Sequence, residues 1–243
     1  MQSMTWAHVL NLPSFVVNMT ECSERLALTQ DRLSKAGFTQ LHRWDAVDAR
    51  DPVQLGNGWN MVGNPAFAKT DAEFIEYKGK QGCFLSHILL WQHIIDNGIE
   101  IANVFEDDVC FHNQWHELAH KYWEATPRDW DVLYMGSQID YMMPSHIMRT
   151  PVFCTHAYVI TLEGARKCLS ATLGDPDGVR TIDCMLIDAM KADLMGVKPC
   201  PFNWYAWNGT LFADPAAFTK WEKRNSGLVF QDIELGTYVR EWQ

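Results

Sequence analysis

One stretch of the sequence decides the fold class, Ile101-Ala102-Asn103-Val104-Phe105-Glu106-Asp107-Asp108-Val109. Its first half is apolar and favours a strand, and the Asn97-Gly98 pair before it is typical of the end of a helix. We therefore predict a buried strand whose carboxyl end carries three adjacent carboxylates. In an extended chain Glu106 and Asp108 point to the same side, where both can reach one hard divalent ion such as Mg²⁺ or Mn²⁺. The alternative interpretation is an exposed acidic turn that binds no metal.

Strand and helix patterns alternate through most of the chain, which predicts an α/β fold around a central sheet. Besides the stretch above, the expected strands are 15–19, 38–44, 130–136 and 155–160. The expected helices are 20–35, 82–97, 113–125, 162–173 and one that follows Thr181 and ends at Gly196. Residues 50–77 are rich in Gly, Asn, Asp and Pro, and we expect them to form a long loop. No repeat or linker divides the sequence, so we expect one domain over residues 1–243, with an irregular aromatic tail from 200 to 243.

The composition limits the classes of partner and compartment. The chain has 243 residues and a formal net charge of −10, which disfavours broad binding to nucleic acid. Its seven Cys residues are scattered without a C-x-x-C pair, so we expect reduced thiols in a cytoplasmic protein. No apolar run approaches the roughly 18 residues of a transmembrane helix, and the first residues make a poor signal peptide. The sequence leaves open whether the protein contacts a membrane surface.

Two further segments can each be interpreted in two ways. The segment from Lys78 to His87 joins the expected loop to a helix, and its glycines and Lys78 suit an anion such as a diphosphate at the helix N-terminus. It can equally be an ordinary helix start with a solvated lysine. Asp183 follows Thr181-Ile182 at the start of another expected helix. It is either the N-cap of that helix or a general base near the carboxylate cluster.

The segment His116-Glu117-Leu118-Ala119-His120 matches the H-E-x-x-H pattern of zinc hydrolases. Two histidines four residues apart share one face of a helix, and the glutamate between them can act as a base. However, position 123 is Trp where the extended pattern has Gly, and no glutamate occurs between Glu124 and Glu163. With no third ligand at the expected spacing, a zinc-dependent hydrolase around His116 and His120 is the alternative function.

Taken together, these landmarks resemble glycosyltransferase family 25, which contains bacterial lipopolysaccharide sugar transferases and collagen galactosyltransferases. The segment Gly82-Cys83-Phe84-Leu85-Ser86-His87 followed by Glu106-Asp107-Asp108 is the most specific part of the resemblance. The supporting landmarks are Phe15–Met19, Arg25, Arg32, Asp45–Asp48, Lys78-Gly79, Trp91, Trp130-Asp131, Gly136, Thr155–Ile160, Gly164-Ala165 and Ile182-Asp183. The resemblance covers about residues 14–190, and Lys80 and Gln81 depart from the family pattern.

The resemblance implies a single GT-A-like (Rossmann-like) domain with a central, mainly parallel sheet. It implies an inverting enzyme that moves a hexose, often galactose, from a UDP-sugar to a hydroxyl of a glycan acceptor with the help of Mn²⁺ or Mg²⁺. A role in lipopolysaccharide or other glycan biosynthesis would follow. A non-catalytic carbohydrate-binding domain is a further alternative.

We assign the site residues of this sequence on that basis. Glu106 and Asp108 would hold the metal, and Asp183 would be the catalytic base. The expected donor-binding residues are Val17, Asn18, Asp45, Lys78, Ser86, His87 and Asp107. Trp204, Tyr205 and Trp207 would bind the acceptor by stacking on a sugar ring, and the alternative interpretation is that these three aromatic residues belong to the core.

Overall fold

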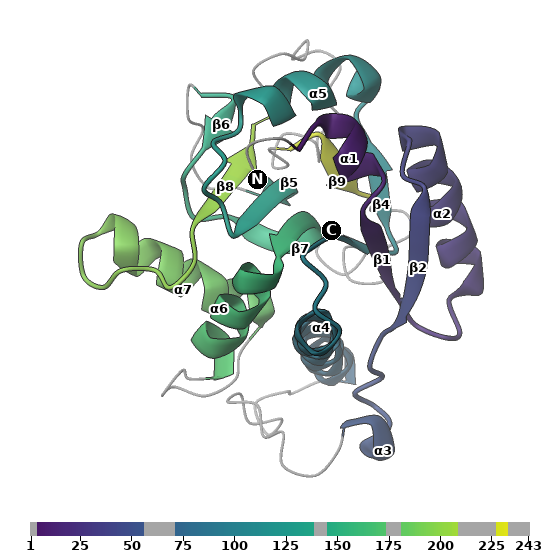
Figure 1. Cartoon of the computed structure of the whole chain (residues 1–243). Coiled ribbons are helices and arrows are strands. Elements are labelled where there is room, and N and C mark those ends of the chain that lie inside the picture. Colours follow the sequence, from purple (N-terminus) through teal and green to yellow (C-terminus); the bar gives the residue numbers. More distant parts are fainter. Residues whose placement is uncertain (1–3, 56–70, 139–144, 174–180, 209–226, 233–243) are drawn as a thin grey trace.

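A computed structural model describes residues 4–55, 71–138, 145–173, 181–208 and 227–232 of the chain. Its central feature is a seven-stranded sheet with the strand order β2-β1-β3-β7-β5-β8-β6 (Figure 1). The strands, in that order, are Gln40–Asp45, Pro13–Asn18, Ile101–Glu106, Phe153–Thr161, Val132–Gln138, Trp204–Trp207 and Ile147–Met148. A second, two-stranded sheet joins β4 (Val109–Phe111) to β9 (Val229–Gln231).

Five strands of the large sheet run in one direction, namely β2, β1, β3, β5 and β8, while β7 and β6 run in the other. This confirms the expected α/β class with a mainly parallel central sheet. The reversed strand β7 lies between β3 and β5, which the sequence analysis did not predict. Because β7 runs against its neighbours, its first residues lie beside the last residues of β3.

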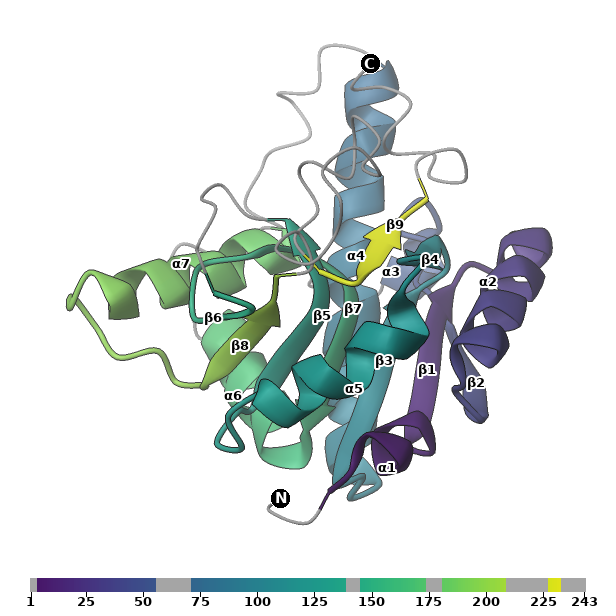
Figure 2. The ribbon, with the colours of Figure 1, turned by 90° about the horizontal axis from the view of Figure 1, so that it is seen from above.

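Helices cover both faces of the sheet (Figures 1 and 2). One face packs against α4 (Asp71–Asp96), α6 (Leu162–Leu173) and α7 (Ile182–Leu194). The other packs against α1 (Trp6–Leu10), α2 (Ser23–Ala36) and α5 (Trp115–Ala125), while the short α3 spans Pro52–Leu55. None of the helices in the described ranges is long and apolar enough to cross a membrane.

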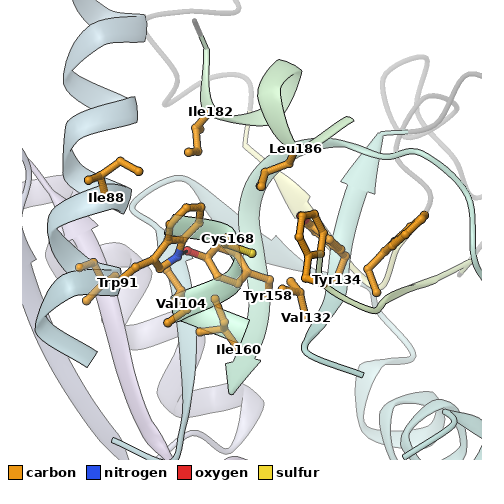
Figure 3. Packing of buried hydrophobic residues seen from close by; sticks show 14 of the residues in the cluster. Ile88, Trp91, Val104, Val132, Tyr134, Tyr158, Ile160, Cys168, Ile182 and Leu186 are labelled. Carbon is orange, nitrogen blue, oxygen red and sulfur yellow. Dashed lines mark hydrogen bonds between the residues drawn. The ribbon is translucent and has the colours of Figure 1, made fainter. Parts of the chain in front are cut away.

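Alternate residues of the central strands enter the two cores, as the two-residue period of a strand requires. Val104 and Tyr158 belong to the core under α4 and α6, where Figure 3 shows them beside Ile88 and Trp91. Phe105, next to Val104 in the chain, belongs to the opposite core. The central strand β3 is therefore buried on both faces, and its one charged side chain, Glu106, lies at its carboxyl end.

The expected strands and helices are all present, with bounds shifted by a few residues, except that α4 begins at Asp71 rather than Gly82. The expectation of a loop was therefore wrong for residues 52–55, which form α3, and for residues 71–77, while residues 56–70 lie outside the described ranges. Ser86 and His87 lie in the middle of a 26-residue helix, so the expected effect of a helix N-terminus on them is wrong as well. Gly37 ends α2 in the left-handed conformation, with a φ of 103°.

The segment 200–243, which was expected to be irregular, contains two strands among its described residues. Trp204–Trp207 form β8 and Val229–Gln231 form β9. The remainder of the expected tail lies outside the described residues. The single domain expected for residues 1–243 stays a prediction.

Helix α4 passes close to the chain that follows β2, and this close approach requires a glycine at position 82. A Cβ atom at Gly82 would stand 2.5 Å from the carbonyl oxygen of Val47, whereas one at Gly79 would meet no described atom within 4 Å. The Ser86 hydroxyl, one turn later, accepts a hydrogen bond from the Val47 amide at 2.8 Å. The glycine in this motif therefore serves helix packing.

We predict that Gly82→Ala lowers the melting temperature, because overpacking at backbone costs about 1–3 kcal/mol. Gly79→Ala is the matched control in the same helix, and it should gain up to about 1 kcal/mol of helix propensity. Thermal melts monitored by circular dichroism measure both. A Gly82→Ala protein that melts at or above the wild-type temperature contradicts this account of the contact.

Candidate active site

A cavity of about 530 Å³ opens where three parallel strands end. Val17 comes from the end of β1, Val47 and Asp48 follow β2, and Glu106 ends β3. The first residues of β7, the first turn of α7 and residues 78–87 of α4 complete the walls. In open α/β sheets ligands bind at this edge, outside the carboxyl ends of the strands. The volume lies within the range of small-molecule sites.

Ten charged side chains line this cavity, and acids outnumber bases. The acids are Glu21, Asp48, Glu106, Asp107, Asp108 and Asp183, and the bases are Arg25, Arg50, Lys78 and Lys80. Arg50 binds both Asp48 and Glu21 at 2.7 Å. The hydrogen bond from Arg50 lowers the pKa of Asp48. The cavity therefore carries an excess of negative charge on the side near β3.

Asp107 is held by three residues from the adjoining β1 and α2. It forms an ion pair with Arg25, and the Asn18 side-chain amide donates to its Oδ2 at 2.7 Å. The Thr29 hydroxyl donates to its backbone carbonyl at 2.7 Å. Burial raises the pKa of the Asp107 carboxyl, and Arg25 opposes that rise. Asp107 thus anchors the end of β3 to the neighbouring elements.

Glu106 reaches the cavity from the last position of β3. The Thr155 hydroxyl donates to its Oε1 at 2.9 Å, and His87 Nε2 lies 3.5 Å from the same oxygen. Burial raises the pKa of Glu106, but His87, His156 and Thr155 together outweigh it, so that the pKa is lowered. Glu106 is therefore an ionised carboxylate in a half-buried setting.

Asp108 is the least satisfied carboxylate of the cluster. Its side chain is buried, and its Oδ1 atom has no hydrogen-bond partner among the described residues. Burial and then the neighbouring Glu106 raise its pKa well above the ordinary value. A cation beside Asp108 would relieve both effects, so this orphaned oxygen fits the divalent ion that the sequence predicted.

The ligand atoms of Cys83, His87 and Glu106 lie within 4.8 Å of one another, a second arrangement that could hold a metal. Glu106 belongs to this group and to the predicted carboxylate pair, whereas Asp108 belongs only to the pair. Thiol and imidazole ligands suit zinc-like ions, and carboxylates suit Mg²⁺ or Mn²⁺. Burial raises the pKa of the Cys83 thiol well above its ordinary value, which disfavours the thiolate that metal binding needs.

Asp183 lies in the cavity wall, in the first turn of α7. The Cys184 amide donates to its Oδ1 at 2.8 Å, and the Cys154 amide approaches its Oδ2 at 3.4 Å. Cys154 has a φ of 71°, an uncommon left-handed conformation for a non-glycine residue. Thr181 is the N-cap residue, so the N-cap interpretation of Asp183 is wrong.

Of the expected donor-binding residues, five line the cavity, namely Val17, Lys78, Ser86, His87 and Asp107. The other two do not. Asn18 is 1% exposed and holds Asp107, and the side chain of Asp45 is 79% exposed and pairs with Arg43. Asp48, three residues after Asp45, takes the place in the wall that Asp45 was expected to take.

The expected acceptor-binding aromatics do not line the cavity. Trp204 and Trp207 are 0% exposed, with their indole N–H groups bonded to Thr150 and Thr126, so the prediction that they stack on a sugar is wrong. They pack in the two cores because β8 lies inside the sheet, between β5 and β6. Tyr205, between them in the chain, packs at the edge of the core on the α5 side.

The sequence analysis missed several residues of the site. Arg50 and Cys154 had no local signal, because the long-range course of the chain brings them to the cavity, whereas Thr155 was part of a quoted landmark. Asp48 and Arg25 were among the quoted landmarks, which is the signal that could have identified them. His116 and Glu117 are exposed on α5, on the sheet face opposite α4, and neither lines the cavity.

Comparison with known proteins gives one family and several relatives. The family model described as "Glycosyltransferase family 25 (LPS biosynthesis protein)" matches residues 11–185. Procollagen galactosyltransferase 2 of Mus musculus is 28% identical over 180 residues, which cover 68% of this chain and 28% of that protein. The Homo sapiens protein of the same name is 32% identical over 173 residues, which cover 65% and 27%.

One relative carries a different description. The Homo sapiens protein named "Inactive glycosyltransferase 25 family member 3" is 32% identical over 105 residues, covering 39% of this chain and 18% of that protein. The chain therefore spans under a third of the length of these relatives. A solved glycosyltransferase involved in glycosylation of the major capsid of PBCV-1 aligns with a TM-score of 0.40 and 9% identity, over 81% of this chain and 80% of the other.

We predict that Asp108→Asn raises the melting temperature of the metal-free protein near pH 7.5 by a few degrees. A raised carboxyl pKa means that the folded state binds more protons than the unfolded state, so stability falls as pH rises above about 3.8. The variant removes this loss, and each unit of pKa shift corresponds to about 1.4 kcal/mol.

The difference between variant and wild type should shrink as pH falls toward 3.8, which thermal melts across a pH series will show. Asp31→Asn, at an exposed position of α2, is the control, because the surface ion pair between Asp31 and Lys35 contributes little to the free energy of unfolding. A wild type that is more stable than Asp108→Asn at pH 7.5 in chelator contradicts the assigned electrostatics.

Proposed function

This chain belongs to glycosyltransferase family 25, and we propose that it transfers a hexose, with galactose the first candidate, from a UDP-sugar to a hydroxyl of a glycan acceptor. The galactose assignment is supported by the relatives named procollagen galactosyltransferase. The site assignment is supported by a cavity of small-molecule size at the ligand-binding edge of the sheet.

The observation that carries the proposal is the carboxylate cluster at the end of β3. A diphosphate is itself an anion, and Glu106 and Asp108 would repel it unless a cation lay between them. The orphaned Asp108 Oδ1 and the ionised Glu106 fit this need. Mn²⁺ or Mg²⁺, when bound to these carboxylates, would supply charge compensation for the leaving diphosphate.

Asp183 is the group we assign to proton removal from the acceptor hydroxyl. An inverting transfer occurs in one displacement, so one base must face the acceptor oxygen. Backbone amides of Cys184 and Cys154 approach the two carboxylate oxygens and orient them. No Lys or Arg side chain among the described residues forms an ion pair with Asp183, which leaves it available to accept a proton. Lys78, in the α4 wall, is placed to attract the donor phosphates.

A non-catalytic, sugar-binding role is the second candidate, and one observation favours it. A relative 32% identical over 105 residues is named as inactive. The zinc hydrolase alternative has no such support, because His116 and Glu117 lie outside the cavity. A transfer assay with UDP-sugars distinguishes the first two candidates.

We predict that Asp183→Asn lowers the transfer rate by about 10²-fold or more, the usual contribution of a positioned base. Its melting temperature and its UDP-sugar binding should stay near wild type, because Asn can still accept a hydrogen bond from the Cys184 amide. Glu117→Gln is the control and should keep full activity. Full transfer by Asp183→Asn would remove Asp183 from the mechanism.

We also predict that UDP-galactose raises the melting temperature only when Mn²⁺ or Mg²⁺ is present, since binding stabilises by mass action. A thermal-shift screen of UDP-, GDP- and CMP-sugars, each with the ion and with EDTA, makes the measurement. Stoichiometric zinc in the purified protein, together with loss of activity in Glu117→Gln, would instead support the hydrolase. Sugar binding without transfer in the wild type would support the non-catalytic role.

A further inference from the structure

We propose that His87 is a positioning residue for Glu106, and that a buried chain of hydrogen bonds from Trp91 through Tyr158 fixes the ring tautomer it needs for this role. The proposal rests on the proposed function in one respect, namely that Glu106 serves the donor site. In this proposal the cluster of Cys83, His87 and Glu106 does not bind the metal. It orients the Glu106 carboxylate, and the metal is bound by oxygen ligands.

The chain of contacts runs through the core behind the cavity. Trp91 Nε1 donates to the Tyr158 Oη at 2.9 Å, and the same Oη lies 2.9 Å from His87 Nδ1. His87 Nε2 then lies 3.5 Å from Glu106 Oε1. Figure 3 shows the indole nitrogen of Trp91 directed at the Tyr158 oxygen. Trp91, Tyr158 and His87 are at most 1% exposed, so water does not exchange freely with their polar atoms.

The donors and acceptors in this chain allow one fully satisfied arrangement. An indole N–H can only donate, so the Tyr158 oxygen must accept from Trp91. The single phenol hydrogen then needs an acceptor, and His87 Nδ1 is the polar atom at hydrogen-bond distance. If Nδ1 carried the ring proton instead, two donors would meet at the Tyr158 oxygen. The phenol hydrogen would then be buried without an acceptor, which is unfavourable.

The ring proton of His87 is therefore on Nε2, which faces Glu106. This nitrogen has no hydrogen-bond partner among the described residues, and it lies 3.5 Å from Glu106 Oε1. A metal-binding imidazole nitrogen must present a lone pair, and a protonated Nε2 cannot do so. Thr155 on β7 donates to Glu106 Oε1 at 2.9 Å, and the Nε2–H group of His87 on α4 faces the same oxygen at 3.5 Å, so the carboxylate is oriented from both sides. His87 thus orients a cavity carboxylate from behind.

The first test is the tautomer itself, measured by long-range ¹⁵N–¹H correlation NMR on the metal-free full chain with labelled histidine. We expect His87 to show a protonated Nε2 and an unprotonated Nδ1. Tyr158→Phe removes the phenol hydrogen, and its spectrum should show a loss of that tautomer preference, while exposed His116 stays unchanged. A proton on Nδ1 in the wild type, or an unaltered tautomer in Tyr158→Phe, overturns the proposal.

The second test separates positioning from metal ligation. Gln at position 87 keeps an N–H donor but lacks an imidazole, whereas Leu lacks both. We expect Mn²⁺ titrations followed by electron paramagnetic resonance to give His87→Gln an affinity within about 3-fold of wild type. His87→Leu should lose about 10-fold or more, as for other supporting residues around a metal. Equal losses in the two variants overturn the proposal.

The two measurements also separate this proposal from the proposed function. Absence of Mn²⁺ binding by the wild-type protein would contradict the metal-dependent transferase. The NMR tautomer, measured without metal, would still decide whether the Trp91, Tyr158 and His87 chain exists.

Discussion

Three consecutive carboxylates at the end of a strand buried on both faces are the constraint on which the rest of this site depends. Like charges in a buried place repel, and each of the three is compensated differently. Asp107 is neutralised by Arg25 and held by Asn18, and Glu106 is held by Thr155 and faced by His87. Asp108 keeps an oxygen without a partner among the described residues. The protein thus satisfies two of the carboxylates itself and leaves the third for a ligand.

The sheet topology is what makes this division feasible. Parallel β1 lies on one side of β3 and brings Asn18 to Asp107, while reversed β7 lies on the other side and brings Thr155 to Glu106. Helix α4 crosses close to the chain after β2 because Gly82 has no side chain, and this crossing places His87 in the cavity wall. The polar end of β3 is therefore surrounded by partners from both of its neighbouring strands and from a covering helix.

Local patterns were enough to predict the strand, its carboxylates and most helices, because an apolar run that ends in charge is a short-range signal. The start of α4 could not be predicted, since Gly79 and Gly82 resemble helix breakers and the packing contact that explains Gly82 is tertiary. Trp204 and Trp207 were predicted to stack on a sugar because the sequence alone does not distinguish aromatic residues in the core from aromatic residues on the surface. Thr155 lies 49 residues from Glu106 in the sequence, and Arg25 lies 82 residues from Asp107, so no local pattern could predict these contacts.

The central claim is that Glu106 and Asp108 bind the donor diphosphate through a divalent ion. Isothermal titration of UDP into the wild-type protein, once with Mn²⁺ and once with EDTA at matched ionic strength, tests it most directly. The account predicts saturable heat of binding with Mn²⁺, and a loss of affinity of at least about 10-fold with EDTA or in Asp108→Ala. Equal UDP affinity in all three titrations would contradict it, since the carboxylates would then play no part in holding the donor.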